Sequence, residues 1–105
     1  PSYVNVFKRE VYDLIDYLKN SKKRSLDKII SQIRAVTNKV LYYSIPDNVI
    51  CQYVAKKIMS LKKIDKCAAI DKISTAEKQL VNSSKKIFVY ELLFIDLYEQ
   101  LMASY

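Results

Sequence analysis

Acidic side chains at helical spacing are the first candidates for chemistry in this sequence. Asp13 and Asp16 are three residues apart, and Glu91, Asp96 and Glu99 lie in one stretch near the end of the chain. Paired carboxylates can act as general acid and base. Histidine is absent, and no glycine-rich phosphate loop occurs, so neither the commonest general base nor a nucleotide-binding motif accompanies them. The pattern favours solvated carboxylates and salt bridges, and we expect no catalytic residue in this chain.

The two cysteines are the second candidates. Cys51 and Cys67 are too few for a disulfide framework and too few for a zinc site. Both lie in partly apolar surroundings of helical periodicity. We therefore expect two reduced cysteines that pack as small apolar side chains, no metal ligand and no cofactor held by these residues.

Basic side chains are the third candidates. The chain holds 18 Lys and Arg against 11 Asp and Glu, a net charge of +7, and Lys22, Lys23 and Arg24 are consecutive. Cationic side chains release counterions when they bind nucleic acid, so these three residues are a possible DNA contact. A second basic set comprises Lys56, Lys57, Lys62, Lys63 and Lys66. The alternative is that these lysines form a solvated helix face. The chain is rich in Lys, Ile, Asn and Tyr, as an AT-rich genome would produce, so the positive charge can also reflect composition.

The elements that position these side chains are predicted to be helices. The chain has 105 residues, of which half are hydrophobic, and it contains no glycine. Without glycine, tight turns that need a positive φ have no strain-free residue. We expect an all-α fold, a compact five-helix bundle, in a single domain over residues 1–105. No uncharged run approaches the roughly 20 residues of a membrane span, so we expect no membrane partner.

Apolar residues at three- and four-residue steps mark the first two helices. The first is predicted over about residues 3–19, and the second from residue 26 until near Ser44, because Pro46 disfavours helical geometry at Ile45. Ser25 is the expected N-cap of the second helix. The first stripe comprises Val4, Phe7, Val11, Leu14, Ile15 and Leu18, and the second Leu26, Ile29, Ile30, Ile33, Val36, Val40 and Leu41.

Two further helices follow the proline. Pro46 is expected in the first turn of the third helix, whose apolar residues run from Val49 to Leu61. Asp65 or a nearby residue is the expected N-cap of the fourth, which carries the small residues of a close helix packing. A polar segment around Ser83 is predicted to end it.

The last helix differs from the other four because it is apolar nearly all round. Between Ile87 and Met102 the polar interruptions are Glu91, Asp96, Glu99 and Gln100. Positions about 100° apart on a helix cannot all face one core. We expect part of this helix to contact another protein, with exposed apolar surface from Phe94 to Met102. The alternative is a central helix wrapped by the other four.

Two stretches together resemble one family, the carboxy-terminal collar domain of replication factor C small subunits, which belong to the eukaryotic sliding-clamp loader. The first, residues 29–61, is a helix with Arg34 and Leu41, an Ile-Pro corner at Ile45-Pro46, and an apolar helix. The second, residues 79–93, has a leucine before a short break, then lysine, Ile87-Phe88 and Glu91. Among small subunits these features look most like the type called subunit three in animals and subunit five in budding yeast.

The resemblance implies an assembly and a compartment. In the family, five collar domains form a ring, and amino-terminal AAA+ ATPase domains beneath it hold ATP and Mg²⁺, contact the sliding clamp and make most contacts to primed DNA. This chain would then be the carboxy-terminal domain of a longer subunit, in agreement with a sequence that begins at Pro1, and would be nuclear. Its partners would be the other subunits of a hetero-pentamer. The expected subunit interface comprises Phe88, Glu91, Phe94, Ile95, Tyr98 and Leu101.

The chain departs from the family pattern near the start of the last helix. Glycine is usual in the family where Ser83 stands, which predicts a costly left-handed serine there. The histidine that often follows the aromatic residue is Val89 in this chain. Two other functions remain open at this stage: a free-standing basic helical domain that binds nucleic acid, and a helical adaptor or cytokine-like bundle.

Overall fold

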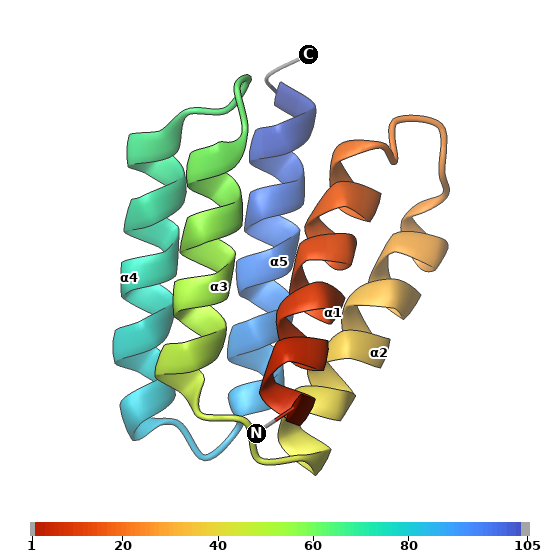
Figure 1. Ribbon diagram of the computed structural model, residues 1–105. Helices are drawn as coiled ribbons and strands as arrows, with labels where there is room; N and C mark the ends of the chain where they lie inside the picture. The colour runs from red at the N-terminus through yellow and green to blue at the C-terminus, as the bar shows by residue number, and fades with distance from the viewer. Residues whose placement is uncertain (1, 104–105) are drawn as a thin grey trace.

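Five helices run alternately up and down the bundle (Figure 1). The computed structural model describes residues 2–103, with side chains from Asn5 onward. Within that range no strand occurs, and the helices are α1 (Ser2–Lys19), α2 (Leu26–Tyr42), α3 (Asp47–Ser60), α4 (Lys66–Asn82) and α5 (Lys86–Ala103). The predicted all-α five-helix bundle is confirmed, and every described helix begins and ends within a few residues of its predicted bounds.

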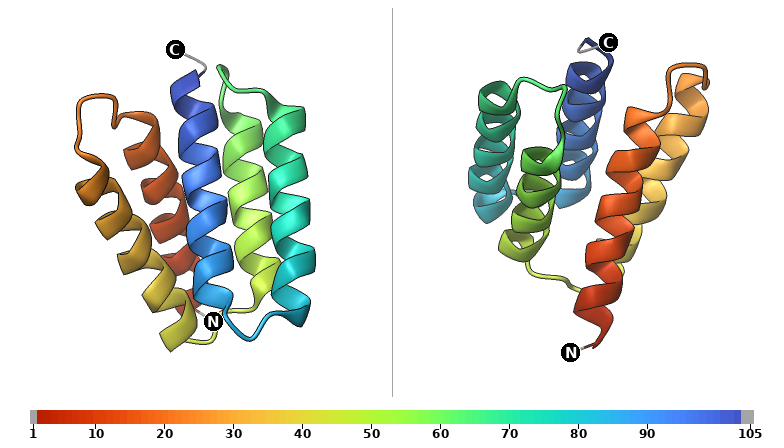
Figure 2. Two further views of the ribbon diagram at one scale, coloured as in Figure 1. Left: turned by 180° about the vertical axis from the view of Figure 1, so that it is seen from behind. Right: turned by 45° about the horizontal axis from the view of Figure 1, so that its top comes forward.

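The helices form two layers. Figures 1 and 2 show α1 and α3 in one layer and α2, α5 and α4 side by side in the other. α1 packs against α2, α3 and α5, and α5 packs against α1, α2 and α4, whereas α3 and α4 pack against each other. α5 is therefore the middle helix of its layer. Only its outward side is left without a helical neighbour, and this face is turned to the viewer on the left of Figure 2.

The core lies between the two layers and draws on all five helices. The apolar stripes predicted for α1 and α2 face this core almost throughout, and Val4 is outside the described side chains. Leu26 and Leu41 are exceptions, because 58% and 36% of their surfaces are exposed, near the two ends of α2. The largest buried side chains are Tyr90, Phe94, Ile15, Leu18, Ile29, Ile33, Ile50, Ile58, Leu80, Leu97 and Leu101. Their density on α5 shows that this helix is a main contributor to the core.

Three helix starts show how well capping rules predict the structure. Asp65 caps α4, since its carboxylate accepts a hydrogen bond of 3.1 Å from the backbone N–H of Ala68. This is the N-cap interaction that the sequence predicts. Ser25 occupies the N-cap position of α2 but makes no side-chain cap hydrogen bond. Pro46 occupies the N-cap position of α3, one residue before the first helical turn in which it was expected.

A serine in left-handed geometry ends α2. Ser44 has φ of 52°, and the N–H groups of Ser44 and Ile45 donate to the carbonyls of Leu41 and Val40, at 3.2 and 3.1 Å. These are the two bonds of a Schellman motif, which usually places glycine at this position. Buried Ile45 and Val40 supply the apolar contact that accompanies it. In a chain without glycine, Ser44 adopts this geometry at a cost of about 1–2 kcal/mol.

The left-handed serine predicted at Ser83 is absent. Ser83 has φ of −90° and ψ of 135°, which is extended backbone that any residue adopts. Its hydroxyl accepts a hydrogen bond of 3.0 Å from the backbone N–H of Lys85, and this bond organises the connection to α5. The prediction was wrong because the connection turns through extended residues and a side-chain hydrogen bond, without a helical C-cap that requires positive φ.

Candidate functional site

The inward face of α5 is filled by residues that were expected at its surface. Phe94, Leu97 and Leu101 are at most 1% exposed and belong to the core. The prediction of an exposed apolar surface from Phe94 to Met102 is therefore wrong for these three side chains. The physical reason is that α5 has neighbours on three sides, so the second half of the helix is enclosed by α1, α2 and α4.

The apolar side chains that α5 exposes lie in its first two turns. Phe88 is 53% exposed and Leu92 is 59% exposed, and the two are four residues apart, so they project from the same face of the helix. Half-buried Val89 lies beside them. We call Phe88, Val89 and Leu92 the α5 surface. Of the expected interface residues, Phe88 belongs to it, Glu91, Ile95 and Tyr98 are half-buried, and Phe94 and Leu101 are inaccessible.

A groove between α4 and α5 adjoins the α5 surface. It has a volume of about 580 Å³ and is lined by Lys78, Gln79, Asn82, Ser83, Lys85, Phe88, Val89 and Leu92. The Lys85 ammonium lies 5.9 Å from the centre of the Phe88 ring, within the range of a cation–π contact. On the other side of Phe88, a hollow of about 410 Å³ extends to Leu41 at the end of α2. The Phe88 ring is thus a ridge between two depressions, and its rim is polar or cationic.

An ion pair joins α5 to α2 beside this surface. The Arg34 Nε atom lies 3.1 Å from the Glu91 Oε1 atom. The Glu91 side chain is 14% exposed and that of Arg34 is 60% exposed, so the pair is only partly shielded from water. A pair of this exposure contributes about 1 kcal/mol or less to stability. The pair links the second turn of α5 to the middle of α2.

A partly buried polar cluster anchors the start of α5 to the start of α3. The Lys86 ammonium lies 2.7 Å from Asp47 Oδ2, and the Tyr90 hydroxyl donates a hydrogen bond to Asp47 Oδ1. Tyr90 is fully buried. Its pKa is raised well above the usual value, first by burial and then by the hydrogen bond to the Asp47 carboxylate and the charge of that group. The phenol therefore stays neutral and acts as a structural donor, rather than as an acid or base.

The cysteines differ in environment. Cys51 is buried, and its pKa is raised to about 12 by burial first, then by the charges of Glu77 and Asp47. A buried thiol that stays protonated is a poor nucleophile, because the thiolate is the reactive form. Cys67 is exposed on α4, and both cysteines are free thiols. Among the side chains described from Asn5 to Ala103, no group of three or more Cys, Asp and Glu could hold a metal ion.

Three of the five acidic residues considered for acid–base chemistry make ion pairs with cations of other helices. Asp16 on α1 lies 3.0 Å from the Lys57 ammonium, and Asp96 on α5 lies 3.9 Å from that of Lys72. With the Arg34–Glu91 pair, these contacts agree with the prediction of solvated carboxylates and salt bridges. In the part of the chain that the structure describes, no helix is both long and apolar enough to cross a membrane.

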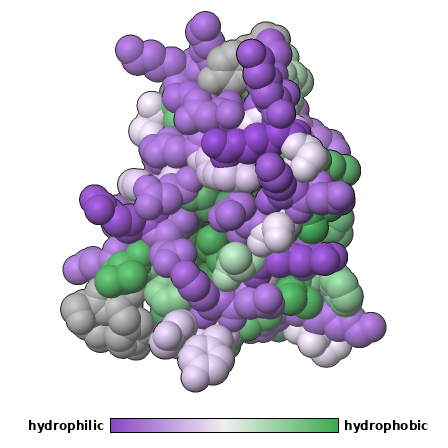
Figure 3. All heavy atoms as spheres, turned by 90° about the vertical axis from the view of Figure 1, so that its right-hand side faces the viewer, coloured by the Kyte–Doolittle hydropathy of each residue, from purple (hydrophilic) through white to green (hydrophobic). Residues whose placement is uncertain are grey.

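The two predicted basic sets are only partly joined by the fold. Lys22, Lys23 and Arg24 lie in the α1–α2 connection, at the same end of the bundle as Lys62 and Lys63 in the α3–α4 connection (Figure 1). Figure 3 shows that the upper part of the α1–α2 side is mostly hydrophilic, whereas its exposed hydrophobic residues gather lower down. Sequence reasoning missed Lys19, which joins this end. In an up-and-down bundle, odd-numbered connections share one end, and this parity would have been a usable signal.

Comparison with models of known protein families, with curated proteins and with solved structures finds no match for this chain. The residues and their geometry are therefore what a functional proposal can rest on.

Proposed function

We propose that this chain is an oligomerisation domain, the collar of a DNA sliding-clamp loader subunit, and that its α5 surface contacts the collar of a neighbouring subunit. The observation that carries the proposal is the pair Phe88 and Leu92. Both are more than half exposed, and they are one turn apart on α5. An exposed apolar pair with a polar rim is typical of a protein contact site.

Contacts between the two stretches that resemble the family support this proposal. Arg34 of the first stretch pairs with Glu91 of the second, and Asp47, directly after the Ile45-Pro46 corner, binds Lys86 and Tyr90. The resemblance rests on order and spacing along the chain. In the folded chain Arg34 and Glu91 of that pattern are in contact, and Asp47, Lys86 and Tyr90 join the same two stretches close by.

The size of the α5 surface sets what a partner must add. Full burial of a Phe or Leu side chain contributes about 1.5–3 kcal/mol, so covering the exposed halves of Phe88 and Leu92 contributes about 1–1.5 kcal/mol each. A stable interface buries roughly 800 Å² on each partner. The contact must therefore extend into the α4–α5 groove on one side and to Leu41 on the other. Such an interface suits a ring in which each collar is held by several subunits.

Analytical ultracentrifugation tests the proposal. We expect the domain to form a complex when mixed with sibling subunits of the same loader, and the variant Phe88→Ser with Leu92→Ser to lose at least tenfold in affinity. The matched control is Val81→Ser with Tyr42→Ser, since these side chains are 79% and 81% exposed and do not line the groove. A domain that stays monomeric with every sibling would overturn the proposal, as would equal losses from both variants.

The enzymatic part of the proposed role belongs to an upstream domain. ATP and Mg²⁺ would be bound by an ATPase domain that precedes these residues in the full-length subunit, and the collar would hold that domain in the pentameric ring while the clamp is loaded onto primed DNA. A full-length chain without a P-loop upstream of Pro1 would contradict this assignment, even if the α5 surface proved to bind a protein.

A further inference from the structure

The net positive charge is concentrated at one end of the bundle. Residues 19–28 and 62–66 hold eight Lys and Arg but only two acidic residues, so six of the seven net positive charges lie in these two short segments. The rest of the chain is nearly neutral. Both segments lie at the end of the bundle where α1 and α3 finish and α2 and α4 begin (Figures 1 and 2). We call residues 19–28 and 62–66 the basic end.

The cations of the basic end differ from those elsewhere in having few internal partners. Among the described residues, the five ion pairs use Arg34, Lys39, Lys57, Lys72 and Lys86, all outside the basic end. Lys22, Lys23 and Lys62 are exposed and pair with no described carboxylate. The acidic residues nearby are Asp27, in the first turn of α2, and Asp65, which caps α4. Of the ten cations outside the basic end, five are paired in this way, whereas Lys22, Lys23 and Lys62 are not.

The connection that carries Lys22 and Lys23 is ordered. Ser21 is fully buried, and its hydroxyl donates to the carbonyl of Tyr17. The guanidinium carbon of Arg24 lies 4.1 Å from the centre of the Tyr17 ring, and the backbone N–H of Arg24 donates to the Ser21 carbonyl at 2.9 Å. Because the segment is held at both Ser21 and Arg24, the two lysines between them extend from a defined loop. Little ordering entropy is then lost when an anion binds.

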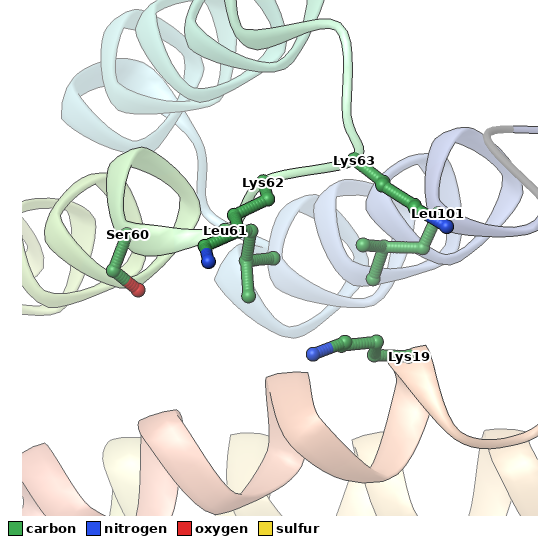
Figure 4. Close-up of a pocket in the computed structure, with 6 residues that line it drawn as sticks. All are labelled: Lys19, Ser60, Leu61, Lys62, Lys63 and Leu101. Carbon is green, nitrogen blue, oxygen red and sulfur yellow. The ribbon is translucent and has the colours of Figure 1, made fainter.

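A pocket joins the two segments. It has a volume of about 380 Å³ and is lined by Lys19, Ser60, Leu61, Lys62, Lys63 and Leu101. Figure 4 shows Lys19 extending from the end of α1 and Lys62 from the α3–α4 connection, on opposite sides of the gap between them. Two ammonium groups, one from α1 and one from the α3–α4 connection, can approach one phosphate from two directions. Lys19 thereby links the pocket to Lys22 and Lys23 on the next connection.

We propose that the basic end binds the phosphate groups of a nucleic-acid backbone, through the Lys19–Lys62 pocket and the Lys22–Arg24 loop. The separated cations suit a polymer of regularly spaced phosphates better than a single small anion. A membrane surface is less suited. The large apolar side chains exposed near this end are Leu26 and Met59, on different helices, and they form no broad apolar face. Within the described range, Tyr17 is the one aromatic ring that a cation of the basic end contacts. The Arg24 guanidinium covers this ring.

Fluorescence anisotropy with a labelled 20-base-pair duplex of arbitrary sequence tests the proposal. Four or five phosphate contacts give a slope of about −4 in log K against log salt concentration, a loss of about 200-fold between 50 and 200 mM salt. Lys22→Glu with Lys62→Glu should weaken binding at least tenfold and reduce the slope by about 2. The matched control is Lys78→Glu with Lys85→Glu, which makes the same change of net charge at the α4–α5 groove and should change affinity less than threefold.

Two results would overturn the proposal. Equal losses from both double variants would show that net charge alone attracts the duplex. Binding to vesicles that contain phosphatidylserine, without salt-dependent binding of the duplex, would assign the basic end to a lipid surface. This inference goes beyond the proposed oligomerisation and depends on different residues. Either one can fail in its own assay without affecting the other.

Discussion

The α5 surface and the basic end differ in how each is connected to the fold. Phe88 and Leu92 project from α5, and Tyr90, which lies between them in the sequence, is buried and hydrogen-bonded to Asp47. Lys22 and Lys62 lie in connections between helices, exposed and without partners among the described residues. The contrast teaches that a change beside the α5 surface affects stability as well as binding, whereas a change at the basic end can affect binding alone.

The largest expected effect separates the two sides of α5. Phe94 is 1% exposed and Phe88 is 53% exposed, so the same substitution can be compared on one helix. Phe94→Ala should lower the free energy of unfolding by about 3–5 kcal/mol, because it removes buried surface and leaves a cavity. Phe88→Ala should lower it by about 1 kcal/mol or less. Urea unfolding followed by circular dichroism measures both, and equal losses would mean that Phe88 is buried in solution.

The next largest effect concerns the hydrogen bond between Tyr90 and Asp47, which anchors the start of α5 to α3. Asp47→Ala should destabilise the fold by about 1–3 kcal/mol, since the buried Tyr90 hydroxyl is left without its acceptor. Tyr90→Phe should cost about 1 kcal/mol, because it removes the donor and leaves the ring in place.

A double-mutant cycle provides the control for the anchor. In the Tyr90→Phe background, Asp47→Ala should cost less than it does alone, because no buried hydroxyl remains to be left unsatisfied. Additive losses would contradict the bond between Tyr90 and Asp47. The Lys86–Asp47 pair then accounts for what remains of the cost of Asp47→Ala.

Alkaline pH is expected to lower the free energy of unfolding through Cys51 on α3. The pKa of Cys51 is raised by burial from 9.0 to about 12, so the folded state holds its proton where the unfolded state loses it. The raised pKa of Cys51 contributes stability that is complete below pH 9 and is lost as pH rises toward 12. Between pH 9 and 10 the free energy of unfolding should fall by about 1 kcal/mol. Cys51→Ala should remove that part of the decline, and Cys67→Ala at an exposed position should leave it unchanged. Unfolding curves at pH 8, 9 and 10 measure the difference.

Much of this fold follows from the sequence because four of the helices have a clear apolar side. The stripe on α1 and the cap at Asp65 were predictable from spacing and residue type alone. For α5 the same reasoning fails, since an all-round apolar helix does not show which side its neighbours cover. Only the packing of α1, α2 and α4 around it explains why Phe94 is buried while Leu92 is exposed.

The turns and the sites were less predictable for a similar reason. Ser44 and Ser83 both follow helices in a chain without glycine, and spacing alone does not tell which of them adopts positive φ. The difference is that buried Ile45 can contact Val40 after Ser44, which completes a Schellman motif. The basic end likewise depends on the direction of each helix, because Lys22 and Lys62 are 40 positions apart and meet only through topology.

The smallest expected effect on stability is at the basic end, and it tests the contrast with the α5 surface most directly. Lys22 and Lys62 each lie four residues before the start of a helix, α2 and α4, whose N-termini favour negative charge. Lys22→Glu with Lys62→Glu should therefore leave the free energy of unfolding unchanged to within about 0.5 kcal/mol, or raise it slightly. A loss above about 1 kcal/mol in urea unfolding would assign these lysines a structural role. Unchanged or higher stability together with weaker duplex binding would mean that the fold does not require positive charge here, and that the lysines serve a ligand.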